Sequence, residues 1–200
     1  MSGPTTFRAI EHDSDPLFAA RWSPRSFATD AIDDATLMRC FEAARWAPSA
    51  FNSQPWRFLY ATRGDAAWDQ FLGCLAATNR SWAYRAAALV LLVSKTSLMP
   101  PGQTMEVPSP SHSFDAGAAW ANLANQAAIC GWSAHAMGGF DRDTARAELG
   151  VPEGYSLEAM IAIGRQGDTA ALPAAFQALE RPSPRRPLGE LVMHGAFRAG

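Results

Sequence analysis

Apolar residues recur at helical spacing along much of the chain. This spacing predicts helices over residues 15–22, 33–46, 64–79, 114–137 and 142–149. Asp33 or Asp34 can cap the second of these helices, and Asp141 can cap the last. The fourth helix is rich in alanine and is expected to end between Gly131 and His135. Its small side chains allow another helix to approach closely, which favours a central, dimer-forming helix or, alternatively, a plain core helix.

Three apolar runs between the predicted helices are typical of strands. Residues 57–62 are typical of a strand, 86–94 form a continuous apolar run that suits a strand buried on both faces, and 157–164 suit an inner strand. Residues 95–113 contain four prolines and little periodicity, which predicts a long loop. The chain after Pro173 is expected to be extended.

Composition limits the possible classes of protein. The length of 200 residues suits one domain, or one protomer of an intertwined dimer. The net charge is −2, and the sequence has no basic stripe that would indicate nucleic-acid binding. The three cysteines are widely spaced and the four histidines lack metal-ligand spacing, so we expect neither disulfides nor a metal site. The longest apolar run, 86–93, is too short to span a bilayer. A soluble, cytoplasmic protein is expected, without a membrane or nucleic-acid partner.

The stretch from Ala47 to Phe58 concentrates polar groups between two prolines. Pro48 and Pro55 interrupt any helical ladder, and the side chains between them offer several donors and acceptors. Trp56 and Phe58 lie on one side of the following strand and can anchor this segment. The segment is either an ordinary helix-to-strand connection or a binding loop.

Two other segments carry candidate chemistry. Arg21, Ser23 and Arg25 can offer guanidinium groups and a hydroxyl to a phosphate, although a solvated helix end has the same composition. Gly138 and Gly139 permit positive φ and close approach of the backbone to a flat ring, although a simple turn before a helix also explains them.

Taken together, four motifs resemble those of the FMN-dependent nitroreductase family. They are Arg21–Phe27, Pro48–Trp56, Gly138–Asp141 and Arg185–Leu188, and they occur in the family's order. The resemblance implies an α+β fold with a central mixed or antiparallel sheet flanked by helices, in a single domain spanning 1–200. It also implies an intertwined homodimer with FMN at the subunit interface. The FMN-binding positions that it implies are Arg21, Trp22, Ser23, Arg25, Pro48, Ser49, Ala50, Asn52, Asn79, Gly138, Gly139 and Arg185.

Some of these roles are specific. The resemblance implies that Arg21, Ser23, Arg25 and Arg185 hold the FMN phosphate, with Arg186 a weaker candidate, and that the Gly138 backbone N–H faces flavin N5. Asn79 matches an Asn-x-x-Trp pattern of the family, but a helix C-cap explains it equally well. No side chain is implied as an obligatory acid or base, because the flavin carries the chemistry.

The implied reaction passes hydride from NADH or NADPH through FMN to an electron-poor small molecule such as a nitroaromatic or a quinone. Residues 95–113 are expected to shape the substrate pocket, 1–14 to form an N-terminal extension, and 174–200 to form an arm around the partner subunit. The alternatives are a specialised family member (a reductive dehalogenase, an enoate-type reductase or a flavin-cleaving enzyme) and a non-catalytic FMN-binding or sensing protein.

Overall fold

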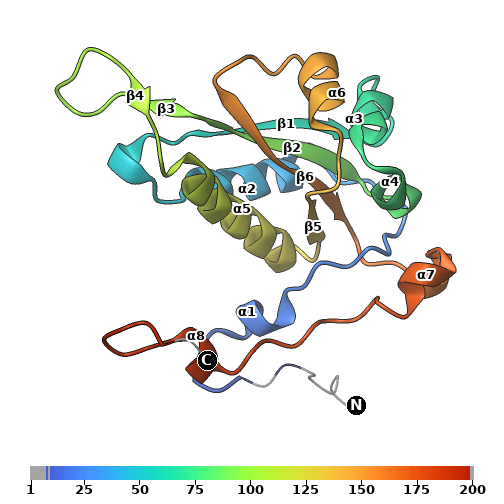
Figure 1. The fold of residues 1–200 in the computed structure, drawn as a ribbon. Helices are drawn as coiled ribbons and strands as arrows, with labels where there is room; N and C mark the ends of the chain where they lie inside the picture. Colours follow the sequence, from blue (N-terminus) through green and yellow to red (C-terminus); the bar gives the residue numbers. More distant parts are fainter. Residues whose placement is uncertain (1–7, 9, 199–200) are drawn as a thin grey trace.

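A four-stranded sheet forms the centre of the protein (Figure 1). The computed structural model describes residue 8 and residues 10–198, so most of the expected 1–14 extension lies outside the described part. The strand order is β1 (Trp56–Thr62), β2 (Ala88–Lys95), β6 (Tyr155–Gly164) and β5 (Ser133–Met137). Every neighbouring pair is antiparallel. The α+β prediction is confirmed, and of the two predicted sheet types the antiparallel one is present.

Strand β2 separates two hydrophobic cores. All of its residues except the last are buried, as its continuous apolar run predicts. One core contains residues of α3 (Trp68–Cys74), α4 (Ala77–Ala83) and α6 (Arg142–Glu148), and the other contains residues of α2 (Asp34–Arg45) and α5 (His112–Ile129). Figure 1 shows α2 and α5 on one face of the sheet and α3 and α6 on the other. Each large apolar side chain buried in these cores contributes about 1.5–3 kcal/mol.

Carboxylates begin several helices, and the sequence predicted this at Asp33 and Asp141. The Asp33 carboxylate accepts a hydrogen bond from the Thr36 backbone N–H at 2.8 Å, which satisfies a free donor at the start of α2. Asp141 caps α6 in the same way, and Asp15 caps the short helix α1 (Pro16–Ala20). Local polar residues therefore fix where these elements start.

Two predicted helices differ from the structure. The 64–79 helix is divided into α3 and α4, because Leu75 leaves the helix to form an antiparallel bridge with Phe140. The helix predicted over 114–137 ends at Ile129, and Gly131 then adopts a left-handed conformation with φ +74°. Residues 133–137 form strand β5 instead, because pairing with β6 provides hydrogen bonds that the local sequence does not indicate.

The two segments predicted to lack regular structure contain short elements. Residues 95–113 include the hairpin β3 (Ser97–Leu98) and β4 (Val107–Pro108), which projects from the body in Figure 1, and the first turn of α5. After β6 come η2 (Thr169–Ala171), α7 (Ala174–Gln177) and α8 (Leu188–Leu191). Most of residues 178–198 are exposed and run away from the sheet. No helix in the described ranges is long and apolar enough to cross a bilayer.

Candidate functional site

The loop from Pro48 to Pro55, here called the proline loop, has an unusual backbone. It contains η1 (Ala50–Asn52) and joins α2 to β1. Phe51, Asn52 and Gln54 adopt φ of 52°, 54° and 46°. Residues with a Cβ rarely occupy this left-handed region, and each such residue costs about 1–3 kcal/mol. The surrounding structure must therefore hold the loop in place.

Asp115 on α5 holds the first part of the proline loop. Its side chain is 3% exposed, and its carboxylate accepts from the Ala50 backbone N–H at 3.2 Å and from the Ser111 hydroxyl at 3.1 Å. The Ser49 hydroxyl accepts from the Gln54 backbone N–H at 3.0 Å. The two partners are 65 residues apart, so the sequence alone does not indicate this contact. The loop consequently presents Phe51 and Asn52 outward from a fixed backbone.

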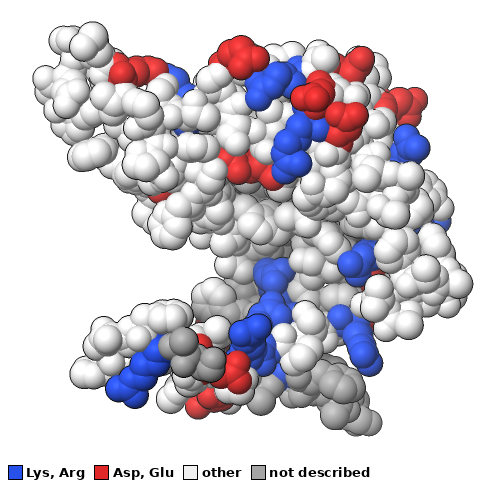
Figure 2. Space-filling model, in the orientation of Figure 1, with Lys and Arg blue, Asp and Glu red and all other residues white. Residues whose placement is uncertain are grey.

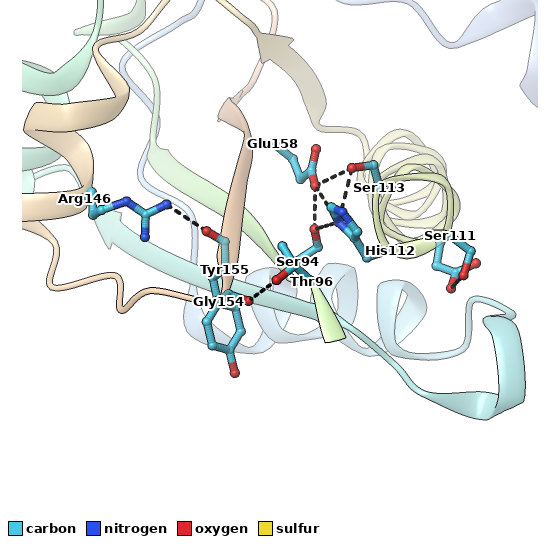
Figure 3. Close-up of polar contacts among 10 residues, drawn as sticks. Ser94, Thr96, Ser111, His112, Ser113, Arg146, Gly154, Tyr155 and Glu158 are labelled. Atoms are coloured by element: carbon cyan, nitrogen blue, oxygen red, sulfur yellow. Dashed lines mark hydrogen bonds and ion pairs between the residues drawn. The ribbon is translucent and has the colours of Figure 1, made fainter. Parts of the chain in front are cut away.

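A polar cluster fixes the first turn of α5 to the sheet (Figure 3). The Ser94 hydroxyl of β2 lies 2.7 Å from Nδ1 of His112 and donates to the Glu158 carboxylate of β6. The Ser113 hydroxyl donates to the same carboxylate at 2.8 Å. Ser94 is fully buried and its hydroxyl contacts both His112 and Glu158, which favours a structural role for this serine. The cluster supports the helix that carries Asp115.

Three arginines form a second candidate site. Arg21 and Arg185, both predicted to bind phosphate, lie close enough for their charges to interact, and Arg8 joins them. Burial lowers the pKa of Arg21, and the positive charge of Arg185 lowers it further. Among the described residues, none of the three forms a salt bridge with a carboxylate. Figure 2 shows basic side chains gathered in the hollow between the main body and the segment that carries α1 and α8.

This cluster is chemically suited to a phosphate monoester. Such a group carries a charge of about −1.5 to −2 near neutral pH and accepts hydrogen bonds in the fork geometry of guanidinium groups. The Ser23 hydroxyl lies 3.4 Å from Nη1 of Arg21, so it is part of the same site. An anion here would relieve the repulsion among the arginines. No periodicity or motif surrounds Arg8 in the sequence, so it is not among the predicted site residues.

Other predicted phosphate-binding groups lie beside this cluster rather than in it. The Arg25 guanidinium lies over the Phe176 ring at 5.6 Å from its centroid. The backbone N–H groups of Arg25 and Ser26 donate to the Glu180 carboxylate at 2.8 and 2.7 Å, which ties the arm to this turn. Trp22 is half-buried, and Arg186 is exposed and is not among the charges acting on Arg21.

The two adjacent glycines form a third group with Asn79. The Asn79 side-chain amide donates to the Gly139 carbonyl at 2.9 Å, and a Cβ added at Gly139 would lie 2.8 Å from the same amide nitrogen. This turn brings Gly139 close to Asn79, whereas the predicted approach of its backbone to a flat ring stays a prediction. Neither glycine has a positive φ, so the left-handed conformation that the pair permits is not adopted here. Asn79 lies within α4 and is not its C-cap.

His135 connects the arginine-bearing turn to the strand that leads into the glycines. Its Nδ1 lies 2.9 Å from the Pro24 carbonyl, so Nδ1 carries the proton. Its ring packs against Trp82 with centroids 4.9 Å apart. Burial lowers the pKa of His135, and the Arg25 charge lowers it further against the opposing effect of the Pro24 carbonyl. The histidine is therefore neutral near pH 7.

Within one protomer the predicted residues are distributed over opposite ends of the sheet. The proline loop leads into Trp56, which pairs with Ser94 near the C-terminal end of β2. Asn79 lies on the helix that precedes Ala88, at the other end of that strand. An eight-residue strand is about 26 Å long. Among the described residues there is no cluster of His, Cys, Asp and Glu that could hold a metal ion.

Comparison with known proteins identifies the family. The model of the Nitroreductase family matches residues 18–165, and the chain belongs to this family. A solved structure described as an oxidoreductase containing FMN is 40% identical, covers 100% of both chains and has a TM-score of 0.94. A Desulfovibrio desulfuricans protein solved in complex with FMN is 25% identical over 93% of this chain and 100% of its own, with a TM-score of 0.67.

Two curated relatives match shorter segments. A Streptomyces coelicolor protein whose name includes NADH dehydrogenase and NAD(P)H nitroreductase is 52% identical over 44 residues, 22% of each chain. The 5,6-dimethylbenzimidazole synthase of Rhodospirillum rubrum is 37% identical over 81 residues, 39% of this chain and 38% of its own. In both matches the chain spans well under half of the relative's length.

Proposed function

We propose that the protein is an FMN-dependent oxidoreductase. The observation that carries this proposal is the arginine cluster of Arg8, Arg21 and Arg185, which has no carboxylate partner among the described residues. Two of its members occupy the phosphate positions of the family motifs. A full-length relative at 40% identity is described as containing FMN, which supports the same cofactor here.

The residues of this chain supply binding and orientation. Arg21 and Arg185, with Ser23 and the neighbouring Arg25, would hold the phosphate, while Gly138 would provide a backbone donor beside flavin N5. FMN held there would supply the redox chemistry that links NADH or NADPH with a nitroaromatic, a quinone or a similar acceptor. The name of the Streptomyces relative supports this class of donor. No side chain of the site is assigned as an obligatory acid or base.

The active form is proposed to be a homodimer that completes each site. Pro48, Ser49, Ala50 and Asn52 would reach the FMN of the partner subunit, because they lie at the other end of the sheet from Asn79 and Gly139. Residues 174–198 would wrap around the partner. This segment exposes Leu179, Leu191, Val192 and Phe197, which is typical of a surface that another chain covers. The hairpin of residues 95–113 is proposed to shape the acceptor pocket.

The visible spectrum of the purified protein tests this function. A yellow protein that bleaches with NADH or NADPH under anaerobic conditions, and recovers when a nitroaromatic or quinone is added, supports it and ranks the donors. A yellow protein that no nicotinamide reduces would indicate FMN binding or sensing without turnover. A colourless protein that cannot be reconstituted with FMN contradicts the proposal. Light scattering during size-exclusion chromatography tests the homodimer.

A specialised activity is the second candidate, because of the similarity to 5,6-dimethylbenzimidazole synthase. A flavin-cleaving enzyme of that kind would form 5,6-dimethylbenzimidazole, which mass spectrometry detects in the reaction mixture. Stoichiometric acceptor reduction without this product favours the general oxidoreductase.

A further inference from the structure

Arg8 joins three segments that are far apart in the sequence. Its Nε donates to the Ser183 carbonyl at 2.9 Å. Its Nη1 donates to the Ala19 carbonyl at 2.8 Å and to the Arg21 carbonyl at 2.6 Å. One guanidinium thus connects the N-terminal segment, the end of α1 and the arm. It also fixes the backbone of Arg21, the residue that begins the phosphate motif.

The remaining donors and the surroundings of Arg8 indicate an anion. No described residue accepts a hydrogen bond from Nη2, so this end of the guanidinium is available to a ligand. Burial lowers the pKa of Arg8, and the positive charges of Arg185 and Arg21 lower it further. Glu11, an acidic residue of the same segment, accepts from the Leu188 backbone N–H on the arm. Backbone carbonyls therefore hold the Arg8 guanidinium near Arg21 and Arg185, and no described carboxylate forms a salt bridge with any of the three.

We propose that Arg8 is a third cation of the FMN phosphate site and that the phosphate locks the N-terminal segment to the arm. This inference rests on the proposed FMN-binding function. A phosphate dianion between two arginines and Arg8 would satisfy Nη2 and remove the repulsion among the three charges. Arg8 is a binding residue through Nη2 and a positioning residue for Arg21 through Nη1.

The Arg8→Gln variant tests the charge of Arg8 separately from its hydrogen bonds to the backbone carbonyls. Glutamine keeps side-chain N–H donors that can reach carbonyls but carries no charge. Arg181→Gln is the matched control, because Arg181 is an exposed arginine on the same arm. The dissociation constants of FMN and of riboflavin, which lacks the phosphate, are measured for each apoprotein by flavin fluorescence. We expect Arg8→Gln to weaken FMN binding by about tenfold or more, while riboflavin binding and both affinities of the control stay unchanged.

The outcomes distinguish this inference from the proposed function. A wild-type protein that binds no FMN contradicts the proposed function itself. A wild-type protein that binds FMN beside an Arg8→Gln variant with the same FMN affinity overturns only the role of Arg8. Equal losses of FMN and riboflavin affinity also overturn it. Such a result would mean that Arg8 only supports the structure, because a structural effect does not depend on the phosphate. If circular dichroism shows that Arg8→Gln does not fold, Arg8→Lys is the second variant, because lysine keeps the charge. Arg8→Lys must retain the wild-type preference for FMN over riboflavin, and loss of that preference rejects the assignment.

Discussion

Removing the Asp115 carboxylate should release the proline loop. In the Asp115→Ala variant the Ala50 N–H and the Ser111 hydroxyl lose their acceptor, 3.2 and 3.1 Å away. A hydrogen bond to a charged acceptor contributes about 1.5–3 kcal/mol, so both together contribute about 3–6 kcal/mol. The variant also removes the cost of burying a charge in a side chain that is 3% exposed, so we expect a net loss of unfolding free energy near the lower end, about 3 kcal/mol.

Calorimetry and hydrogen exchange measure this effect. For a domain of this size each kcal/mol lowers the Tm by about 2–4 °C, which predicts a decrease of about 6–12 °C. The amides of residues 49–54 should also exchange faster, because their left-handed residues relax once the loop is released. Asp115→Asn is a milder variant that keeps an acceptor oxygen, and Glu106→Ala, on the exposed hairpin, is the control. An Asp115→Ala protein with an unchanged Tm and unchanged loop exchange would refute this account of how the loop is held.

Three further predictions concern the other parts of the site. Arg21→Ala combined with Arg185→Ala should weaken FMN binding, since each charge-assisted contact to phosphate contributes about 1.5–3 kcal/mol. Isothermal titration calorimetry measures the FMN affinity, and a wild-type affinity in the double variant would remove both residues from the phosphate site. Gly139→Ala should lower the unfolding free energy by about 1–3 kcal/mol, because its Cβ meets an amide at 2.8 Å, whereas Gly138→Ala, with open space around its Cβ, is the control in urea titrations. The pKa of His135 is lowered in the folded protein, so its contribution to stability is present above its unfolded pKa and is lost as the pH falls through the folded value. The His135→Gln variant should therefore show a flatter dependence of unfolding free energy on pH below about pH 6.5. An unchanged pH profile would contradict this.

The sequence predicted elements whose determinants are local. The cap at Asp33 and the apolar run of β2 each specify an element within a few residues, and both agree with the structure. Strand β5 was missed, because residues 133–137 lack a local strand pattern and their extended conformation depends on pairing with β6. The division between α3 and α4 likewise depends on a bridge to Phe140, which is remote in sequence.

The candidate site was predictable only where a motif carried it. Arg21 and Arg185 were selected by position, and the structure places their charges within reach of one another. Arg8 has no motif, and its partners Ala19 and Ser183 lie 11 and 175 residues away, so only the folded chain reveals it. The strain in the proline loop was also hidden, since Phe51 and Gln54 are not residues that sequence rules assign to positive φ.

The alternation of side chains along β2 has an evolutionary consequence. Leu89, Leu91 and Val93 belong to the core beneath the glycine turn, whereas Val90 and Leu92 belong to the core beneath the proline loop. Substitutions at successive positions of this strand are therefore expected to affect different parts of the proposed site. Selection can retune one half while leaving the packing under the other intact, and this modularity suits a fold that hosts many reactions.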